Sequence, residues 1–293
     1  MVFTLGESLL DIIINSPDDA FVRPGGAMLN TAVSLGRSGI EVSLITELGD
    51  DTTAGLITDF LNENNVKSHY IRKYNDNNTS LALAFLDENK KPSYTFMKNY
   101  PESRDLLEIH DFDSEDILLF GSLYSVDTDI RKSIVSNVEK ARQNNVTVIY
   151  DPNIRNPEHL KDKRIMNAVI ENIKYSDIIK GSDEDMTNIF GDNDLQTQLR
   201  NIRDINRNAL IIITLGPDGV IADYNGKQIK LSAMETNVIS TIGAGDAFNA
   251  GIIYALFNTS TEKRFNNIEP LLKSGLRFSA RVCASKDNYI SID

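Results

Sequence analysis

Three small residues lead into an aspartate in the stretch Gly243-Ala244-Gly245-Asp246, and a long apolar run follows. A run that is apolar on all sides is typical of a buried helix, so the small residues are expected at its first turn. Small side chains leave the N–H groups of that turn accessible, and the helix dipole adds partial positive charge, which suits a phosphate. Asp246 could accept a proton there, as phosphoryl transfer to an alcohol requires. Alternatively, it could only cap the helix.

Four residues nearer the N-terminus could bind a polyol. Asp11 lies within an apolar run, and a buried carboxylate without partners is costly, so it must be paired or face a polar ligand such as a sugar. Gly25 and Gly26 precede a helical pattern and would let a ligand approach the backbone. Asn30 has small or apolar neighbours at helical spacing, so its amide is expected to face a crevice. A structural aspartate and a polar residue at a helix edge are the alternatives.

Two further segments could bind a nucleotide and a metal ion. The segment GPDG at 216–219 follows an apolar strand and could admit phosphates, or it could be a plain turn. Three acids at 183–185 open a predicted helix, where the dipole favours each by about 0.3–1 kcal/mol; alternatively, a carboxylate could hold magnesium through water. Neither a GxxxxGK[S/T] loop nor a GxGxxG fingerprint occurs, so a bound nucleotide would be held differently from both.

The elements that position these residues alternate between strand-like apolar runs and helical patterns, which favours an α/β fold with a mainly parallel sheet covered on both faces. The expected strands are 2–5, 42–45, 117–120, 146–150, 178–179 and 210–214, and the expected helices are 26–37, 53–63, 128–144 and 183–190. Asn225-Gly226 predicts a hairpin between 220–224 and 228–231. Polar or small residues follow five of the strands, and the carboxyl ends of parallel strands face one crevice, so a shared ligand site is expected there.

One region interrupts this alternation. Residues 79–86 and 93–97 alternate as strands around the polar turn 87–91, and the run 12–14 resembles a partner for them. A small sheet built from two separate stretches is typical of a lid over a site. We therefore expect a single domain, 1–293, with a lid formed by about 12–23 and 66–101.

Bulk composition excludes several classes of partner. The 293 residues carry a net charge of −12, which argues against nucleic acid and against an anionic membrane. The single cysteine, Cys283, excludes an intramolecular disulfide; it is expected in the core, and a cytoplasmic location is the simplest expectation. No signal peptide and no membrane span are expected.

Several segments resemble, in order and spacing, the ribokinase/PfkB carbohydrate kinases. The two signature regions are similar to GGAMLNTAVSLGRSG at 25–39 and STIGAGDAF at 240–248. Further similarity lies in GESLLD at the start, DPNIR at 151–155, KGSDED at 180–185 and TLGPDG at 214–219. Among the branches of the family, GE…D, GSL and DPNxR look most like fructokinases.

The resemblance implies a three-layer αβα ribokinase-like fold, an ATP-dependent kinase and a role for each matching residue. Asp246 would take the proton of the sugar hydroxyl that attacks the γ-phosphate of ATP, with Gly243, Ala244 and Gly245 as the anion hole. The remaining implied residues are Asp11, Gly25, Gly26 and Asn30 for the sugar, Lys98 and Arg155 for sugar or phosphate, Lys180, Thr214, Gly216 and Gly219 for the nucleotide, and Asp185 for Mg²⁺.

The resemblance favours phosphorylation of D-fructose to fructose 6-phosphate, by a homodimer that pairs through the lid. The alternatives are a kinase for 2-keto-3-deoxygluconate or a ribosyl compound, and a sugar-binding regulator without catalysis. Two departures matter. Many relatives have Asp-Thr-Thr before GAGD where this chain has Ser240-Thr241-Ile242, so activation by a monovalent cation is in doubt. Asp185 and Ser182 stand where the NxxE motif has glutamate and asparagine, which lengthens the expected contact to magnesium.

Overall fold

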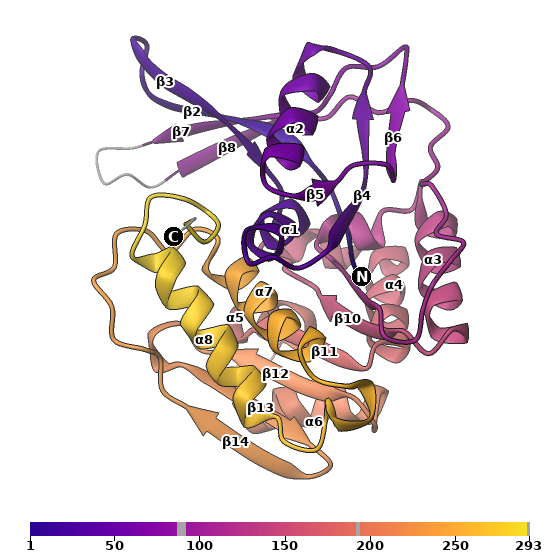
Figure 1. Ribbon diagram of the computed structural model, residues 1–293, viewed down its shortest axis with the longest axis vertical. Helices are drawn as coiled ribbons and strands as arrows, with labels where there is room; N and C mark the ends of the chain where they lie inside the picture. Colours follow the sequence, from indigo (N-terminus) through magenta and orange to yellow (C-terminus); the bar gives the residue numbers. More distant parts are fainter. Residues whose placement is uncertain (87–91, 192–193, 292–293) are drawn as a thin grey trace.

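A large, mainly parallel sheet carries the fold (Figure 1). The computed structural model describes residues 1–86, 92–191 and 194–291, and within them ten strands form this sheet. Their spatial order is β14 (Lys227–Leu231), β13 (Val220–Tyr224), β12 (Leu210–Thr214), β11 (Ile178–Ser182), β10 (Thr147–Asp151), β9 (Ile117–Gly121), β1 (Val2–Leu5), β4 (Val42–Gly49) and β5 (Val66–Lys67), with β6 (Ile71–Tyr74) also paired to β4.

Strand direction changes only at one edge of the described sheet. The pairs from β12 through β1 to β4 are parallel, whereas β12–β13 and β13–β14 are antiparallel. Asn225 and Gly226 connect β13 to β14 with φ angles of 51° and 75°. Two positive φ angles are what a two-residue type I′ hairpin needs, so the predicted hairpin is confirmed.

Helices cover both faces of the sheet and give three layers. One face packs against α1 (Ala27–Arg37), α2 (Thr52–Glu63), α7 (Ala244–Phe257) and α8 (Glu269–Cys283). The other packs against α3 (Arg131–Gln143), α4 (Lys163–Tyr175), α5 (Asp183–Phe190) and α6 (Leu195–Ile205). Successive strand residues point to opposite faces, so Leu118 enters the second core while Leu119 enters the first. The expected three-layer α/β fold is therefore present.

A separate sheet projects from one end of the molecule (Figure 1). Its order is β3 (Asp19–Gly25), β2 (Leu9–Ser16), β7 (Leu81–Leu86) and β8 (Pro92–Met97). The expectation that 66–101 belongs wholly to this sheet is wrong, because β5 and β6 pair with β4 of the large sheet. The polar turn at 87–91 lies outside the described residues.

Other elements also differ from the expected ones. α4 and α6 were not predicted, although each carries apolar residues at helical spacing, such as Val169 and Ile173 in α4 and Leu195 and Leu199 in α6. Cys283, expected in the core, is only partly buried at the last residue of α8. Among the described residues, none of the helices has the length and apolar character needed to span a membrane.

Candidate active site

The first turn of α7 has the bare backbone that the sequence predicts. Gly243 is the N-cap, with φ 80°, and a Cβ there would lie 2.2 Å from the carbonyl oxygen of Asn288, so glycine is required. A Cβ on Gly245 would lie 3.3 Å from Lys180 Nζ, which places this ammonium directly beside the turn. The N–H of Ala244 donates to the carbonyl of Thr241 at 3.2 Å, so the N–H groups of Gly245 and Asp246 are left for an anion.

Asp246 is held from α1 and does not act as a helix cap. Its Oδ2 accepts a hydrogen bond from Asn30 Nδ2 at 2.9 Å, and its carbonyl accepts one from Thr31 Oγ1 at 3.1 Å. Burial raises the pKa of Asp246 to about 6, although the Asn30 hydrogen bond opposes this shift. A carboxylate with such a pKa is ionised at neutral pH and is still basic enough to take a proton. Asn30 itself is buried, as its helical neighbours predict.

A buried ion pair stands behind this turn. Lys180 Nζ lies 2.9 Å from Asp151 Oδ2, and Asn249 Nδ2 donates to the same oxygen at 2.6 Å. Burial alone would lower the pKa of Lys180, but the carboxylates of Asp151, Asp185 and Asp246 hold it above its ordinary value. Lys180 is therefore a cation at the anion site. Sequence reasoning gave no role to Asp151 or Asn249, although Asp151 opens the DPNIR segment.

The polyol-binding candidates lie on β2, β3 and the start of α1. Burial raises the pKa of Asp11 to about 6, and Arg23, opposite it on β3, partly offsets this. A Cβ on Gly25 would lie 2.1 Å from Asp11 Oδ2, so the glycine makes room for that carboxylate. Gly26 has φ 129°, which disfavours any other residue. Asn30 Oδ1 is buried without a hydrogen-bond partner among the described residues, so it can accept a bond from a ligand hydroxyl.

The two basic candidates differ in their partners. Lys98 follows β8, and its Nζ pairs at 2.8 Å with Glu7 Oε1, which also accepts a hydrogen bond from the Tyr100 hydroxyl at 2.8 Å. Arg155 is exposed, and its charge lies near enough to Asp246 to lower the pKa of that carboxyl slightly. Arg155 is thus close enough to influence Asp246, whereas the charge of Lys98 is paired with Glu7.

The predicted nucleotide residues surround the turn after β12. Thr214 Oγ1 donates to the carbonyl of Gly181 at 3.4 Å, and Leu215 N–H donates to the carbonyl of Gly219 at 2.8 Å. Gly219 has φ 97°, and a Cβ there would lie 2.0 Å from the carbonyl oxygen of Leu231. At Gly216 a Cβ would meet nothing within 4 Å, so the backbone is open to a ligand.

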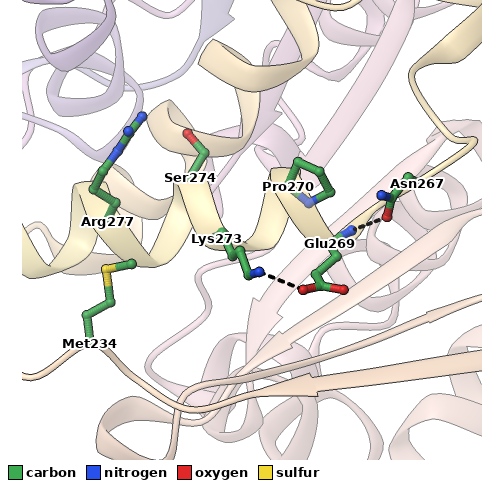
Figure 2. Close-up of a pocket in the computed structure, with 7 residues that line it drawn as sticks. All are labelled: Met234, Asn267, Glu269, Pro270, Lys273, Ser274 and Arg277. Carbon is green, nitrogen blue, oxygen red and sulfur yellow. Dashed lines mark hydrogen bonds and ion pairs between the residues drawn. The ribbon is translucent and has the colours of Figure 1, made fainter.

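A groove of about 430 Å³ runs along α8 (Figure 2). Met234 faces Arg277 across it, and Lys273 and Glu269 form an ion pair of 2.7 Å on the same helix. Ser279, just beyond Arg277 in α8, donates through Oγ to the carbonyl of Ala244 at 2.7 Å. α8 therefore packs beside the first turn of α7.

Asp185, the predicted magnesium residue, forms a capping box with Ser182. Its Oδ2 accepts hydrogen bonds from the N–H and the hydroxyl of Ser182 at 2.8 and 2.7 Å, and Ser182 Oγ accepts one from the N–H of Asp185 at 3.0 Å. No group of three or more His, Cys, Asp or Glu with metal-site geometry occurs in the described part of the chain. The capping role of Asp185 is thus clear, while its role toward a metal stays a prediction.

The chain belongs to the pfkB family of carbohydrate kinases, whose model matches residues 2–293. A fructokinase from Escherichia coli is 28% identical over 269 residues, covering 90% of this chain and 87% of that protein. An aminoimidazole riboside kinase from Salmonella typhimurium is 24% identical, covering 87% of this chain and 80% of that protein.

A solved structure extends the likeness to three dimensions. The fructokinase from Vibrio cholerae O395, in its form bound to fructose, ADP and calcium ion, superposes with a TM-score of 0.85. It is 22% identical and covers 98% of this chain and 94% of that chain. At this identity the likeness establishes the ribokinase-like fold. The resemblance noted in the sequence is therefore confirmed at the level of family and fold.

Proposed function

We propose that this carbohydrate kinase transfers the γ-phosphate of ATP to the terminal hydroxyl of a neutral sugar, and that the sugar is D-fructose. The observation that carries the proposal is Asp246, a buried carboxylate with a pKa of about 6 at the bare first turn of α7. A base beside an anion site is the arrangement that phosphoryl transfer to an alcohol needs.

In the proposed reaction, the sugar oxygen attacks the γ-phosphorus while the bond from that phosphorus to the β–γ bridging oxygen breaks. Asp246 takes the hydroxyl proton and later releases it to solvent, and ADP leaves with the bridging oxygen. Base catalysis of this kind contributes about 10²–10⁴-fold. The N–H groups of Gly245 and Asp246 and the ammonium of Lys180 would stabilise charge on the transferring phosphoryl, since Lys180 stands beside Gly245.

ATP would lie between the turn at 216–219 and α8, which contacts the first turn of α7 through Ser279. Asp185 would hold Mg²⁺ through water, because one oxygen of this carboxylate is engaged in the capping box and magnesium usually keeps several waters. When bound, magnesium supplies positive charge that offsets the phosphate oxygens. Because Ser182 already engages one of its oxygens, Asp185 fits a water-bridged ion better than a fully protein-bound one.

Charge pairing at the polyol end supports a neutral sugar. Lys98 is paired with Glu7, and Arg23 is paired with Asp287 at 3.3 Å. A sugar acid such as 2-keto-3-deoxygluconate, or a sugar phosphate, would have to displace one of these carboxylates. Neutral hydroxyls, in contrast, are suited to Asp11 and to the open oxygen of Asn30. The fructokinase names among the relatives point the same way.

The test is ADP release with magnesium-ATP across fructose, 2-keto-3-deoxygluconate and ribosyl compounds, each in sodium and in potassium salts. We expect turnover with fructose at the highest kcat/KM, and no activity after chelation of magnesium. Preference for the sugar acid would refute the charge argument. Calorimetric binding of sugar without any ADP release would instead indicate the non-catalytic regulator.

We propose further that the small sheet acts as a lid and pairs with the sheet of a second copy. Three exposed apolar side chains on one face of this sheet support the pairing, because such a group seldom faces water without a partner: Val22, Phe85 and Met97. The measurement is molar mass by light scattering. A dimer that becomes a monomer on Val22→Asp is expected, and a monomeric wild-type protein would refute the pairing.

A further inference from the structure

The loop after α8, residues 285–291, packs against the body of the protein beneath the small sheet (Figure 1). We call it the C-terminal loop. Arg37 of α1 donates through Nη1 to the carbonyl of Ile290 at 2.8 Å and stacks over the Tyr289 ring at 4.5 Å. Phe60 of α2 also contacts the Tyr289 ring, with centroids 5.5 Å apart. The far end of the loop is therefore fixed to α1 and α2.

The same loop forms the back of the anion site. The carbonyl oxygen of Asn288 occupies the space that a Cβ on Gly243 would need, at 2.2 Å. Just before the loop, the carbonyl of Cys283 accepts hydrogen bonds from the N–H groups of Ile239 and Ser240, at 2.7 and 3.3 Å. The path of the chain into the first turn of α7 thus depends on where residues 283–288 lie.

One side chain of the small sheet reaches this loop. Arg23 Nη1 donates to the carbonyl of Lys286 at 3.0 Å and to Asn288 Oδ1 at 3.4 Å, and its Nη2 lies 3.3 Å from Asp287 Oδ1. These contacts join residues more than 260 positions apart in the sequence. A guanidinium can make them together because its donors form a planar fork, which an ammonium lacks.

Arg23 also belongs to the polyol site. It stands directly opposite Asp11 in the β2–β3 register, and its charge opposes the effect of burial on that carboxyl. Its side chain is only 18% exposed. The same residue therefore contacts the loop behind Gly243 on one side and influences the candidate sugar-binding carboxylate on the other.

We propose that Arg23 is a positioning residue that docks the small sheet on the C-terminal loop and so aligns the sugar held at Asp11 with the phosphoryl site at Gly243. This inference rests on the proposed function and assigns to it a residue outside the signature segments of the family. Its charge keeps Asp11 suited to the sugar, and its fork fixes the loop.

Two variants distinguish the effect of the Arg23 charge from the effect of its planar fork of donors. Arg23→Met retains the length of the side chain but loses both the charge and the fork. KM for fructose should therefore rise and kcat should fall, each about three- to tenfold. Arg23→Lys retains the charge but not the fork, so KM should return to near the wild-type value while kcat stays low. Arg142→Met is the matched control, because Arg142 also donates to a backbone carbonyl, that of Lys174, but lies at the end of α3; its kinetics should match wild type.

Hydrogen exchange by mass spectrometry tests the docking without any substrate. We expect faster exchange in peptides covering 239–246 and 284–291 of Arg23→Met, and unchanged exchange there in Arg142→Met. The positioning role would be overturned if Arg23→Met had the wild-type kcat, or if Arg23→Met and Arg23→Lys had the same KM and the same kcat as each other. Unchanged hydrogen exchange in Arg23→Met would also overturn it. If the wild-type protein phosphorylates no sugar, the proposed function fails, whereas the exchange result still decides whether Arg23 fixes the loop.

Discussion

Replacing Asp246 with asparagine should lower the activity and raise the stability of the protein. The surroundings of Asp246 determine the size of the stability change. Burial holds the pKa of Asp246 at about 6, against an ordinary value of 3.8. Well below pH 3.8 the carboxyl is protonated in the folded and the unfolded chain, so its burial costs no ionisation energy there. As the pH rises through about 6, the folded protein must bury a charge that the unfolded chain exposes to water. The two pKa values differ by about two pH units, which corresponds to about 3 kcal/mol at most.

Asp246→Asn removes this cost and also removes the base. We expect kcat to fall by about 10²–10⁴-fold at pH 8, with a small change in sugar binding because Asn30 can still donate to the amide oxygen. The free energy of unfolding in urea should rise by up to about 3 kcal/mol at pH 8 and by only about 0.6 kcal/mol at pH 4. The measurements are ADP release and urea unfolding at both pH values.

Asp177→Asn is the matched control. Asp177 also has a pKa raised by desolvation, but it is an exposed residue before β11 and accepts a hydrogen bond from the Val148 N–H at 2.8 Å, at the amino end of the strands. Its variant should retain wild-type turnover. A kcat within tenfold of wild type for Asp246→Asn would refute the base, and an equal change in stability at both pH values would refute the burial of its charge.

Three further predictions test neighbouring features. Gly243→Ala should lower stability by about 1–3 kcal/mol and abolish most turnover, because φ is 80° and Asn288 blocks the Cβ; thermal unfolding and ADP release would check this, and a normal Tm would contradict it. The acid limb of kcat should fall tenfold per pH unit below about pH 6, as Asp246 protonates; a limb near pH 4 would contradict the assignment. Arg104→Met should cost about 3–5 kcal/mol in urea unfolding, because it leaves the fully buried Glu47 without its 2.8 Å partner; a cost under 1 kcal/mol would show that Glu47 finds other partners.

Local pattern made part of the site predictable. Small residues before an apolar run predict the bare helix start, and apolar neighbours at helical spacing predict that Asn30 is buried. Both depend on residues within a few positions of one another. The hairpin at Asn225-Gly226 is predictable for the same reason.

Pairings over long sequence separations were not predictable in this way. Lys180 meets Asp151 from 29 positions away, and Arg23 meets Lys286 from 263 positions away. Nothing in the residue types near Arg23 distinguishes it from a solvated charge. The prediction that β5 and β6 belong to the small sheet was wrong for a similar reason. The residues of a short strand do not indicate which sheet the strand joins.

The bracing of Gly243 by Asn288 has a consequence for biosynthesis. A chain growing on the ribosome can complete the central strands and α7 well before residues 285–291 leave the exit tunnel. Until they do, Gly243 lacks the packing of Asn288 against it, so a chain truncated before residue 285 would have its catalytic residues but a less well-fixed entry to that helix. The catalytic machinery therefore matures only after residues 285–291 have emerged.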